Sequence, residues 1–217
     1  MRIVAVPVKS LDRSKGRLAA LLAPVERAAL TLAMLEDVLD ACLSHAGWET
    51  WVVSPDETVL EVAAGRRARA IPEERGPLGQ AIRQVELLAR EREADALAIL
   101  PGDLPTLTPE ALGRALHTLG PVVLAPSSDG AGTSLLLRRP PRAIPARFGP
   151  DSLARHRALA ADRGLPVATV EEASLSFDVD LPGDILRLLR TDDAGRARAV
   201  ALEMDLGQRL RVRSAEG

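Results

Sequence analysis

Short apolar runs alternate with longer segments of helical periodicity along the chain. Continuous apolar runs of about four to eight residues, bounded by turn-forming residues, are typical of buried strands. The first run is rich in β-branched residues, ends at Pro7-Val8 and opens onto a polar loop. The predicted strands cover residues 2–8, 50–54, 68–71, 96–100, 121–126, 133–137 and 166–170.

Helical patterns occupy the intervals between these strands. From Pro24 to His45 apolar residues recur at three- and four-residue steps, with Pro24 near the first turn, where proline is tolerated. Asp56 and Thr108 are placed to cap two further helices. The predicted helices cover residues 24–45, 56–64, 78–93, a segment starting at 108, 150–163, and two segments starting near 182 and 195.

This alternation predicts the fold class. Helices of about ten or more residues between strands act as crossover connections, so we expect an α/β fold, a three-layer αβα sandwich with a mostly parallel sheet. The chain has 217 residues and neither repeats nor linkers, which predicts a single domain over residues 1–217 with a C-terminal helical tail at about 195–217. Ligands of such folds bind at the carboxyl ends of the strands.

Composition restricts the class of partner. Apolar residues make up 47% of the chain and charged residues 27%, as in ordinary globular proteins. The net charge of -2 and the aromatic content of 2% argue against a nucleic-acid partner, which requires a basic face or stacking rings. Cys42 is the single cysteine, no segment approaches a membrane-spanning length, and the first apolar run is too short for a signal peptide. We therefore expect a cytoplasmic protein without a membrane partner.

The loop after the first strand is the first candidate for chemistry. Of 28 basic residues only Lys9 and Lys15 are lysines, and both lie in this loop with Gly16 and Arg17. Cationic side chains can neutralise a polyphosphate and a departing pyrophosphate, and glycine permits close backbone approach. The loop matches neither a Walker motif nor a dinucleotide fingerprint, so its spacing alone is explained equally well by an ordinary solvated basic loop.

Asp103 follows the apolar strand 96–100 in the sequence Pro-Gly-Asp-Leu-Pro. A carboxylate there is costly to desolvate without a cation or hydrogen-bond donors. Asp178 and Asp180 share one side of an extended segment because they are two residues apart. Together the three carboxylates favour Mg²⁺, which prefers carboxylate and phosphate oxygens with water. Taken singly, Asp103 is explained as well by turn or helix capping, and the pair by a solvent-facing strand edge.

A pocket for a small anion is predicted where the turn 129–133 meets the segment 149–152. Free backbone N–H groups at a helix N-terminus favour a phosphate or carboxylate, and the hydroxyls of Thr133 and Ser152 would add donors. Capping by Asp151 or Ser152, beside a Gly-rich hairpin turn, is the competing interpretation.

The three histidines, His45, His117 and His156, lie on separate predicted helices without metal-ligand spacing, which indicates neither zinc nor catalysis. His156, one turn after Ser152, could face the predicted anion pocket, although packing is the simpler expectation. The sequence contains no activated Ser or Cys motif that would indicate a covalent intermediate.

Six ordered motifs, reaching to about residue 190, resemble one family: the 2-phospho-L-lactate or phosphoenolpyruvate guanylyltransferases of deazaflavin coenzyme (F420) biosynthesis. The broader resemblance is to nucleotidyltransferases of the MobA-like superfamily, which includes the molybdenum cofactor enzymes and has the GT-A-like fold of nucleotide-diphospho-sugar transferases. The motifs are Val-Pro-Val-Lys9, Ser-Lys15-Gly-Arg-Leu18, Pro-Gly-Asp103-Leu-Pro, Asp129-Gly-Ala-Gly-Thr133, Phe148-Gly-Pro-Asp-Ser152-Leu-Ala-Arg-His156 and Phe177-Asp-Val-Asp-Leu-Pro182.

The resemblance implies transfer of GMP from GTP to phosphoenolpyruvate or 2-phospho-L-lactate, with Mg²⁺ as cofactor and diphosphate as the second product. It implies that Asp103, Lys9 and Lys15 are catalytic. By the same resemblance, the acid substrate binds at Thr133, Gly149 and Ser152; the metal at Asp103, Asp178 and Asp180; and the nucleotide at Lys9, Lys15, Arg17, Leu78, Gly79, Gln80 and Gly102.

The chain departs from its relatives at Gly79-Gln80 and Ser134, where they usually carry Asn, and at Gly16, where Ser is more usual. The first two departures bear on guanine selectivity. The residues leave open phosphoenolpyruvate, 2-phospho-L-lactate and 3-phosphoglycerate as substrates, of which we expect phosphoenolpyruvate, and a homodimer is the default assembly.

Two alternatives remain. One is a molybdenum cofactor or sugar-phosphate nucleotidyltransferase that uses Asp178 and Asp180 as its metal motif; the absence of a Gly-Gly loop after the first strand argues against it. The other is a catalytically inactive nucleotide-binding regulator with the same fold.

Overall fold

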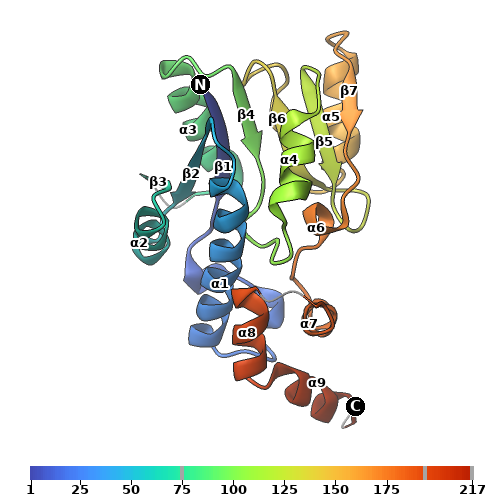
Figure 1. Cartoon of the computed structure of the whole chain (residues 1–217). Helices are drawn as coiled ribbons and strands as arrows, with labels where there is room; N and C mark the ends of the chain where they lie inside the picture. Colours follow the sequence, from blue (N-terminus) through green and yellow to red (C-terminus); the bar gives the residue numbers. More distant parts are fainter. Residues whose placement is uncertain (74–75, 193–194, 216–217) are drawn as a thin grey trace.

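A computed structural model describes residues 1–73, 76–192 and 195–215 of the chain. Within these residues a seven-stranded sheet has the order β3-β2-β1-β4-β6-β5-β7 (Figure 1). The strands are β1 (Arg2–Pro7), β2 (Trp48–Ser54), β3 (Arg69–Pro72), β4 (Ala96–Ile99), β5 (Val122–Pro126), β6 (Thr133–Arg138) and β7 (Val167–Thr169).

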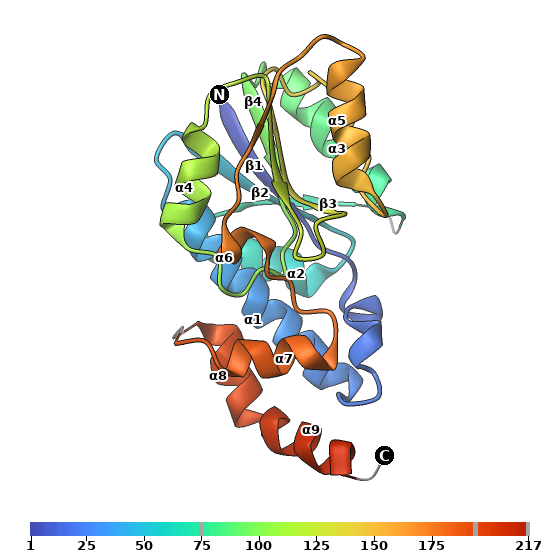
Figure 2. The ribbon, with the colours of Figure 1, turned by 90° about the vertical axis from the view of Figure 1, so that its right-hand side faces the viewer.

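Helices cover both faces of the sheet. In the side view of Figure 2, α1, α2, α4 and α6 lie on one face and α3 and α5 on the other, which confirms the predicted three-layer αβα sandwich. The helices are α1 (Pro24–Leu43), α2 (Glu57–Gly65), α3 (Leu78–Glu91), α4 (Pro109–His117), α5 (Ser152–Ala161), α6 (Ala173–Ser176), α7 (Pro182–Leu189), α8 (Arg196–Glu203) and α9 (Leu206–Ala215).

Alternate side chains of β1 fill the two halves of the core. Val4 and Val6 belong to the cluster of buried residues that includes Leu35 of α1, whereas Ile3 belongs to the cluster that includes Ile82 of α3. Successive side chains of a strand point to opposite faces, so a strand covered on both faces must be apolar throughout. This is why residues 3–8 form a continuous apolar run in the sequence.

The sheet is mostly parallel, as predicted, with β6 as the exception. The pairs β1–β2, β1–β4, β2–β3 and β5–β7 are parallel, and β6 runs antiparallel to both β4 and β5. Residues 127–132 join β5 to β6, a connection too short for a crossover but sufficient for a hairpin. The reversal places Thr133, the first residue of β6, at the edge of the sheet where the parallel strands end.

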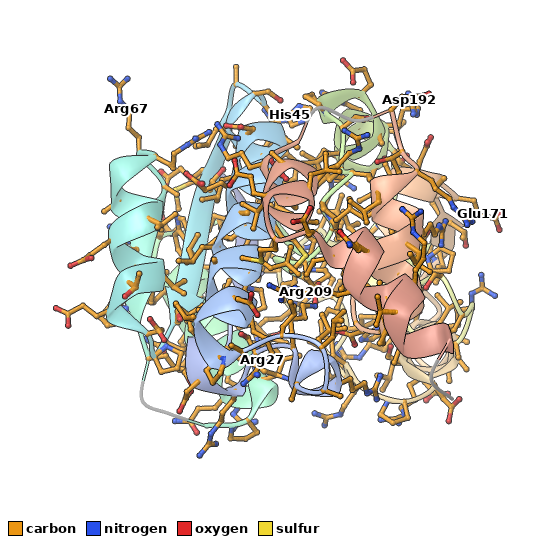
Figure 3. The ribbon with its side chains drawn as sticks, turned by 90° about the horizontal axis from the view of Figure 1, so that it is seen from below. Arg27, His45, Arg67, Glu171, Asp192 and Arg209 are labelled. Atoms are coloured by element: carbon orange, nitrogen blue, oxygen red, sulfur yellow. The ribbon has the colours of Figure 1, made fainter. Side chains whose placement is uncertain are left out.

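The C-terminal helices pack against α1 below the sheet (Figure 1). Leu30 and Met34 of α1 share a buried apolar cluster with Leu188 of α7, Ala201 of α8 and Leu206 of α9. Figure 3 views the molecule from below, with Arg27 and Arg209 over this region and Arg67 projecting away from it. The Arg209 guanidinium lies 2.8 Å from the Glu26 carboxylate at the start of α1.

A buried carboxylate fixes α8 to α1. Asp37 accepts hydrogen bonds from the backbone N–H groups of Arg196, at 2.8 Å, and Ala197, at 2.9 Å. The helix predicted to start near residue 195 begins at Arg196 as α8; the chain then turns at Asp205, which has φ 52°, and continues as α9. Residues 216–217 of the predicted tail lie outside the described residues. None of the helices in the described ranges has the length and apolar character needed to span a membrane.

The order of the strands determines where a ligand can bind. β1 is the point at which the strand order reverses, because β2 lies on one side of it and β4 on the other. Connections after β1 and β4 therefore leave the sheet in different directions and open a crevice between them. The loop with Lys9 and Lys15 follows β1, and the segment with Asp103 follows β4.

Candidate active site

A cavity of about 530 Å³ lies at this crevice. Its walls come from parts of the chain that are distant in sequence: the loop after β1, Thr31 of α1, the first turns of α3, the segment after β4, the start of β6, Phe148 before α5 and the segment before α7. The residues predicted to bind ligands that line it are Lys9, Lys15, Arg17, Leu78, Gly102, Asp103, Thr133 and Asp180.

Lys15 joins two of the predicted metal ligands. Its Nζ donates to Asp103 Oδ2 at 2.5 Å and to Asp180 Oδ1 at 2.9 Å. The lysine side chain is 5% exposed, whereas the Asp103 and Asp180 side chains are 28% and 43% exposed. The ammonium group is thus covered by protein, while both carboxylates keep a surface that faces solvent.

The charges of this cluster shift one another's pKa values. Burial lowers the pKa of Lys15, but the Asp103 and Asp180 carboxylates outweigh burial and bring this pKa above its ordinary value. Burial raises the pKa of Asp180, yet Lys15, with a smaller contribution from Arg17, brings it below its ordinary value. Lys15 and Asp180 are therefore ionised together near neutral pH.

Two further cations extend this wall of the cavity. The Arg17 guanidinium lies 3.7 Å from Asp180 Oδ2, and its side chain is 71% exposed. Lys9 lines the cavity and also contributes to the lowered pKa of Asp180. With Lys15 these groups present positive charge along one side of the cavity, as a polyphosphate requires.

Backbone geometry positions Lys15 and Asp103. Lys15 is in the left-handed region, with φ 49°, between the short 3₁₀ turns η1 (Leu11–Arg13) and η2 (Gly16–Leu18). A β-carbon at Gly102 would come within 3.1 Å of Val8 Cγ2 and 3.3 Å of Val6 Cγ1. Only glycine brings the segment before Asp103 this close to β1 without displacing the core.

Asp178 faces a different neighbour from Asp180. Its Oδ1 accepts a hydrogen bond of 3.3 Å from the Ser128 hydroxyl, in the connection between β5 and β6. Burial, followed by repulsion from Asp103 and then from Asp180, raises the pKa of Asp178 above its ordinary value. The three carboxylates are therefore close enough to repel one another, although Asp178 is not among the residues that line the cavity.

In the described part of the chain, no group of three or more His, Cys, Asp or Glu side chains is arranged to hold a metal ion. The Lys15 ammonium lies between the two carboxylates that come closest to such an arrangement. The predicted three-carboxylate metal site is thus present only as two carboxylates bridged by a lysine, with Asp178 nearby.

Thr133 and His156 meet on the opposite wall. Thr133 Oγ1 lies 3.0 Å from His156 Nδ1, and the backbone N–H of Arg147 donates to His156 Nε2 at 2.9 Å. The Phe148 ring, which lines the cavity, packs edge-on against the His156 ring at 5.4 Å between centroids. This places Thr133 beside α5, the helix that begins at Ser152.

The predicted anion pocket lacks the free backbone N–H groups that were expected in the turn 129–133. Asp129 Oδ1 accepts from the N–H groups of Ala131, at 2.9 Å, and Gly132, at 3.1 Å, so this Gly-rich turn does not offer them to a ligand. The N–H of Leu153, in the first turn of α5, donates to the Ala131 carbonyl. The Asp151 side chain makes no capping hydrogen bond to α5. The competing interpretation of capping by Asp151 is therefore wrong, and the turn and the helix are fastened to each other.

The structure places the remaining predicted residues as follows. Gly149, with φ 112°, and Ser152 lie next to Phe148 at the start of α5, outside the set that lines the cavity. Gly79 and Gln80 follow Leu78 in the first turn of α3, also outside that set. A β-carbon at Gly76 would approach the Gln80 amide oxygen within 2.5 Å, so the Gln80 side chain folds back over the start of its own helix.

Two cavity residues had no role in the sequence-based prediction. Phe148 was quoted within a motif, and Ile82 was assigned only to an amphipathic helix. Phe148 is one of two phenylalanines in the chain, a rarity that could have indicated it. Ile82 has no such signal, because its pattern is that of any apolar helix face.

Solved structures share this fold. A candidate nucleotide-diphospho-sugar transferase from Desulfovibrio desulfuricans G20 matches with a TM-score of 0.75 at 18% identity, over 96% of this chain and 99% of that one. A nucleotidyl transferase from Methanothermobacter thermautotroptrophicus matches with a TM-score of 0.63 at 22% identity, over 86% and 95%. At these identities the likeness confirms the predicted nucleotide-diphospho-sugar transferase fold and nothing further.

Sequence relatives are closer. The phosphoenolpyruvate guanylyltransferases of Rubrobacter xylanophilus and Sphaerobacter thermophilus are 40% and 42% identical, over 84% and 86% of this chain and 91% of each relative. A 3-phospho-D-glycerate guanylyltransferase of Phenylobacterium zucineum is 42% identical over 92% of this chain and 94% of its own. The family model described as "Guanylyl transferase CofC like" matches residues 1–205. The expected resemblance is confirmed, and the chain belongs to the CofC-like guanylyl transferase family.

Proposed function

We propose that this protein is a guanylyltransferase that moves GMP from GTP to phosphoenolpyruvate and releases diphosphate. One observation carries the proposal: Lys9, Lys15 and Arg17, from the loop after β1, face the same cavity as Asp103 after β4 and Thr133 at the start of β6. The cationic side chains are suited to a nucleoside triphosphate. The Thr133 hydroxyl, on the far wall, is suited to a second anion beside it. Family membership supports the same chemistry.

The reaction is a displacement at phosphorus. A phosphate oxygen of the acid attacks the α-phosphorus of GTP, a new P–O bond forms, and the bond between the α-phosphorus and the bridging oxygen breaks. Diphosphate leaves with that oxygen and its electron pair. Because the second pKa of a phosphate monoester is about 6, the attacking oxygen is already largely ionised at neutral pH. Positioning and charge stabilisation then suffice without a general base.

The basic side chains act on the triphosphate. Lys15 and Lys9 neutralise the charge that builds up on the leaving diphosphate, and Arg17, which is the most exposed of the three, reaches toward the mouth of the cavity. Lys15 must first release a carboxylate to contact phosphate, because its ammonium is engaged by Asp103 and Asp180. The proposal therefore includes a shift of the Lys15 side chain when GTP binds.

Asp103 and Asp180 are suited in chemistry to Mg²⁺. Two carboxylates with phosphate oxygens and water form a set that Mg²⁺ accepts. Burial, followed by repulsion from Asp103 and Asp180, raises the pKa of Asp178 beside them, and a divalent cation would relieve the repulsion. When bound, the metal would neutralise charge between the nucleotide and the attacking phosphate. We assign Asp103 and Asp180 as its ligands and Asp178 as an accessory carboxylate.

The acid substrate is assigned to the wall that contains Thr133. Gly149, with φ 112°, and Ser152 at the start of α5 are assigned to the same cradle. The N–H groups of Ser152 and Leu153 already donate to the Gly149 and Ala131 carbonyls, so the α5 N-terminus would attract a carboxylate or phosphate through its dipole rather than through these two donors. The guanine base is assigned to the start of α3, where Leu78 provides an apolar surface on the cavity.

A substrate panel tests the proposal. Purified protein with GTP and Mg²⁺ is mixed with phosphoenolpyruvate, 2-phospho-L-lactate or 3-phosphoglycerate, diphosphate release is measured, and the product is identified by mass. We expect fastest turnover with phosphoenolpyruvate. The other two acids are included because a relative is named for 3-phospho-D-glycerate and the family resemblance implies phospholactate. Absence of diphosphate with every acid, or a preference for CTP or ATP, would contradict the proposal.

A further inference from the structure

His156 is a buried titratable side chain that the proposed chemistry does not use. It is 0% exposed and lies on α5 one turn after Ser152. Its ring contacts three separate parts of the acid-binding wall: the Thr133 hydroxyl, the Arg147 backbone and the Phe148 ring. Any buried imidazole needs hydrogen-bond partners, but here both partners belong to the wall assigned to the acid substrate.

The two polar contacts determine which nitrogen holds the proton. The backbone N–H of Arg147 is a donor only, so His156 Nε2, at 2.9 Å, must accept. In a neutral imidazole the other nitrogen then bears the hydrogen. His156 Nδ1–H therefore donates to Thr133 Oγ1 at 3.0 Å.

The imidazole is held neutral by its surroundings. Burial, with the nearby guanidinium groups of Arg138 and Arg155, lowers the pKa of His156 from 6.5 to about 4. At neutral pH the ring thus keeps one acceptor and one donor, as the two contacts require.

This arrangement orients the Thr133 hydroxyl. Because Thr133 Oγ1 accepts from His156, the hydroxyl hydrogen is not directed at the ring and is available to a ligand in the cavity that Thr133 lines. The same ring anchors the backbone of Arg147, which leads into Phe148 and Gly149. His156 therefore contacts both sides of the acid cradle, Thr133 on one side and the segment that leads to Gly149 on the other.

We propose that His156 is a positioning residue that turns the Thr133 hydroxyl into a hydrogen-bond donor to an oxyanion of the phosphorylated acid and holds the Phe148-Gly149 backbone beside it. The inference rests on the proposed function, since it assumes that the acid binds at Thr133. It assigns no proton transfer to His156, whose ring nitrogens are both occupied by protein groups.

Two substitutions separate the two contacts. His156→Asn keeps a donor to Thr133, because its amide N–H lies near the position of Nδ1, but it loses the acceptor for the Arg147 N–H. His156→Gln keeps the acceptor for Arg147, because its amide oxygen reaches the position of Nε2, but it loses the donor to Thr133. A hydrogen bond to a charged group contributes about 1.5–3 kcal/mol, or roughly 10- to 100-fold in affinity. We expect His156→Gln to raise the KM for the acid by about this factor while the KM for GTP stays within about twofold, and His156→Asn to raise it less.

A double-mutant comparison tests the coupling. Thr133→Val removes the hydroxyl, so adding His156→Gln to it should cost little more than Thr133→Val alone, because contacting residues that act as a unit are not additive. His117→Gln is the matched control: this ring lies on α4, where Nδ1 contacts the Gly113 carbonyl, away from the cavity. Additive losses, or equal losses for the acid and GTP, would overturn the inference.

Calorimetric titration of each variant with phosphoenolpyruvate gives a readout independent of turnover, and thermal unfolding checks folding. If neither His156 variant folds, Thr133→Ser and Thr133→Val test whether the oriented hydroxyl binds the acid. Thr133→Ser must retain affinity for the acid, and Thr133→Val must lose it. An active wild-type enzyme with an unaffected His156→Gln variant refutes the role of His156 alone. A wild-type protein that neither turns over nor binds any phospho-acid refutes the proposed function, and the inference with it.

Discussion

The ammonium of Lys15 lies 2.5 Å from a carboxylate oxygen of Asp103, a residue 88 positions later in the chain. The same ammonium lies 2.9 Å from Asp180, so one cation holds the loop after β1, the segment after β4 and the segment before α7 together. In this state Lys15 takes the place between the carboxylates that a divalent cation would need. The proposed Mg²⁺ would therefore compete with Lys15 for Asp103 and Asp180.

Replacing Lys15 with methionine tests this competition. We expect turnover with GTP to fall by about 10²- to 10³-fold, because a charge that stabilises the leaving diphosphate is lost. Without GTP, Mn²⁺ should bind the variant more tightly than the wild type, because the carboxylates lose their ammonium partner; titration calorimetry measures this. Arg13→Met is the control, since Arg13 lines the cavity without an ion pair to Asp103 or Asp180. Unchanged or weaker Mn²⁺ binding in Lys15→Met would contradict the competition.

Replacing Asp103 with Ala or Asn should abolish measurable diphosphate release, a loss of roughly 10³-fold or more, because the carboxylate that is nearest both Lys15 and the metal position is removed. The fold should persist, as Asp103 is partly exposed and its loss relieves repulsion with Asp178. Circular dichroism and thermal unfolding verify folding, and Asp162→Asn, at the far end of α5, is the matched control. A folded Asp103→Ala enzyme with wild-type turnover would be incompatible with the scheme.

Gly102→Ala should destabilise the protein by about 1–3 kcal/mol, because the new methyl group enters a packed region at 3.1 Å from Val8 and 3.3 Å from Val6. Gly16 lines the same cavity, but a β-carbon there meets nothing within 4 Å. Gly16→Ala should therefore change the free energy of unfolding by less than about 0.5 kcal/mol. Urea denaturation of the two variants compares them directly, and equal effects would show that packing at Gly102 is not the cause.

The buried His156 predicts how stability depends on pH. The folded-state pKa, about 4, lies below the ordinary value of 6.5, so between these values the unfolded chain binds the proton more readily. The contribution of the neutral ring to the free energy of unfolding is complete above pH 6.5, declines as pH falls, and is lost near pH 4. The change is up to about 3 kcal/mol. Denaturant titrations from pH 4 to 7 should show a steeper loss for wild type than for His156→Gln. Parallel curves for the two proteins would contradict a depressed pKa at this residue.

Asp37→Ala should loosen the C-terminal helices without altering the chemistry. Asp37 accepts from two backbone N–H groups at the start of α8, and loss of such a cap costs about 0.5–2 kcal/mol. We expect a lower unfolding temperature, faster amide exchange in α8, and an unchanged KM for GTP. Thr108→Ala, which removes the cap of α4, is the matched control, because its effect on exchange should stay within α4. Exchange in α8 that matches wild type would refute the assigned role.

Much of the architecture could be read from local patterns. The apolar runs marked each of the strands in the described residues. The central strands β4, β5 and β6 are buried almost throughout because helices cover both faces of the sheet, whereas the edge strands β3 and β7 keep exposed positions. The period of α1 and the caps at Asp56 and Thr108 were equally visible, since both depend on neighbours within one turn. The short helix α6 and the break at Asp205 were missed, because neither has a Gly or Pro that would signal it.

The sequence by itself determined the strands, the main helices, the family and the loops that hold the reactive residues, because these depend on local periodicity and ordered motifs. Tertiary structure decided that Lys15 bridges Asp103 and Asp180, that Asp178 turns to Ser128, and that His156 orients Thr133. Such contacts join residues brought together only by strand order and helix packing. Spacing along the chain does not encode the direction in which a side chain points once the sheet has formed.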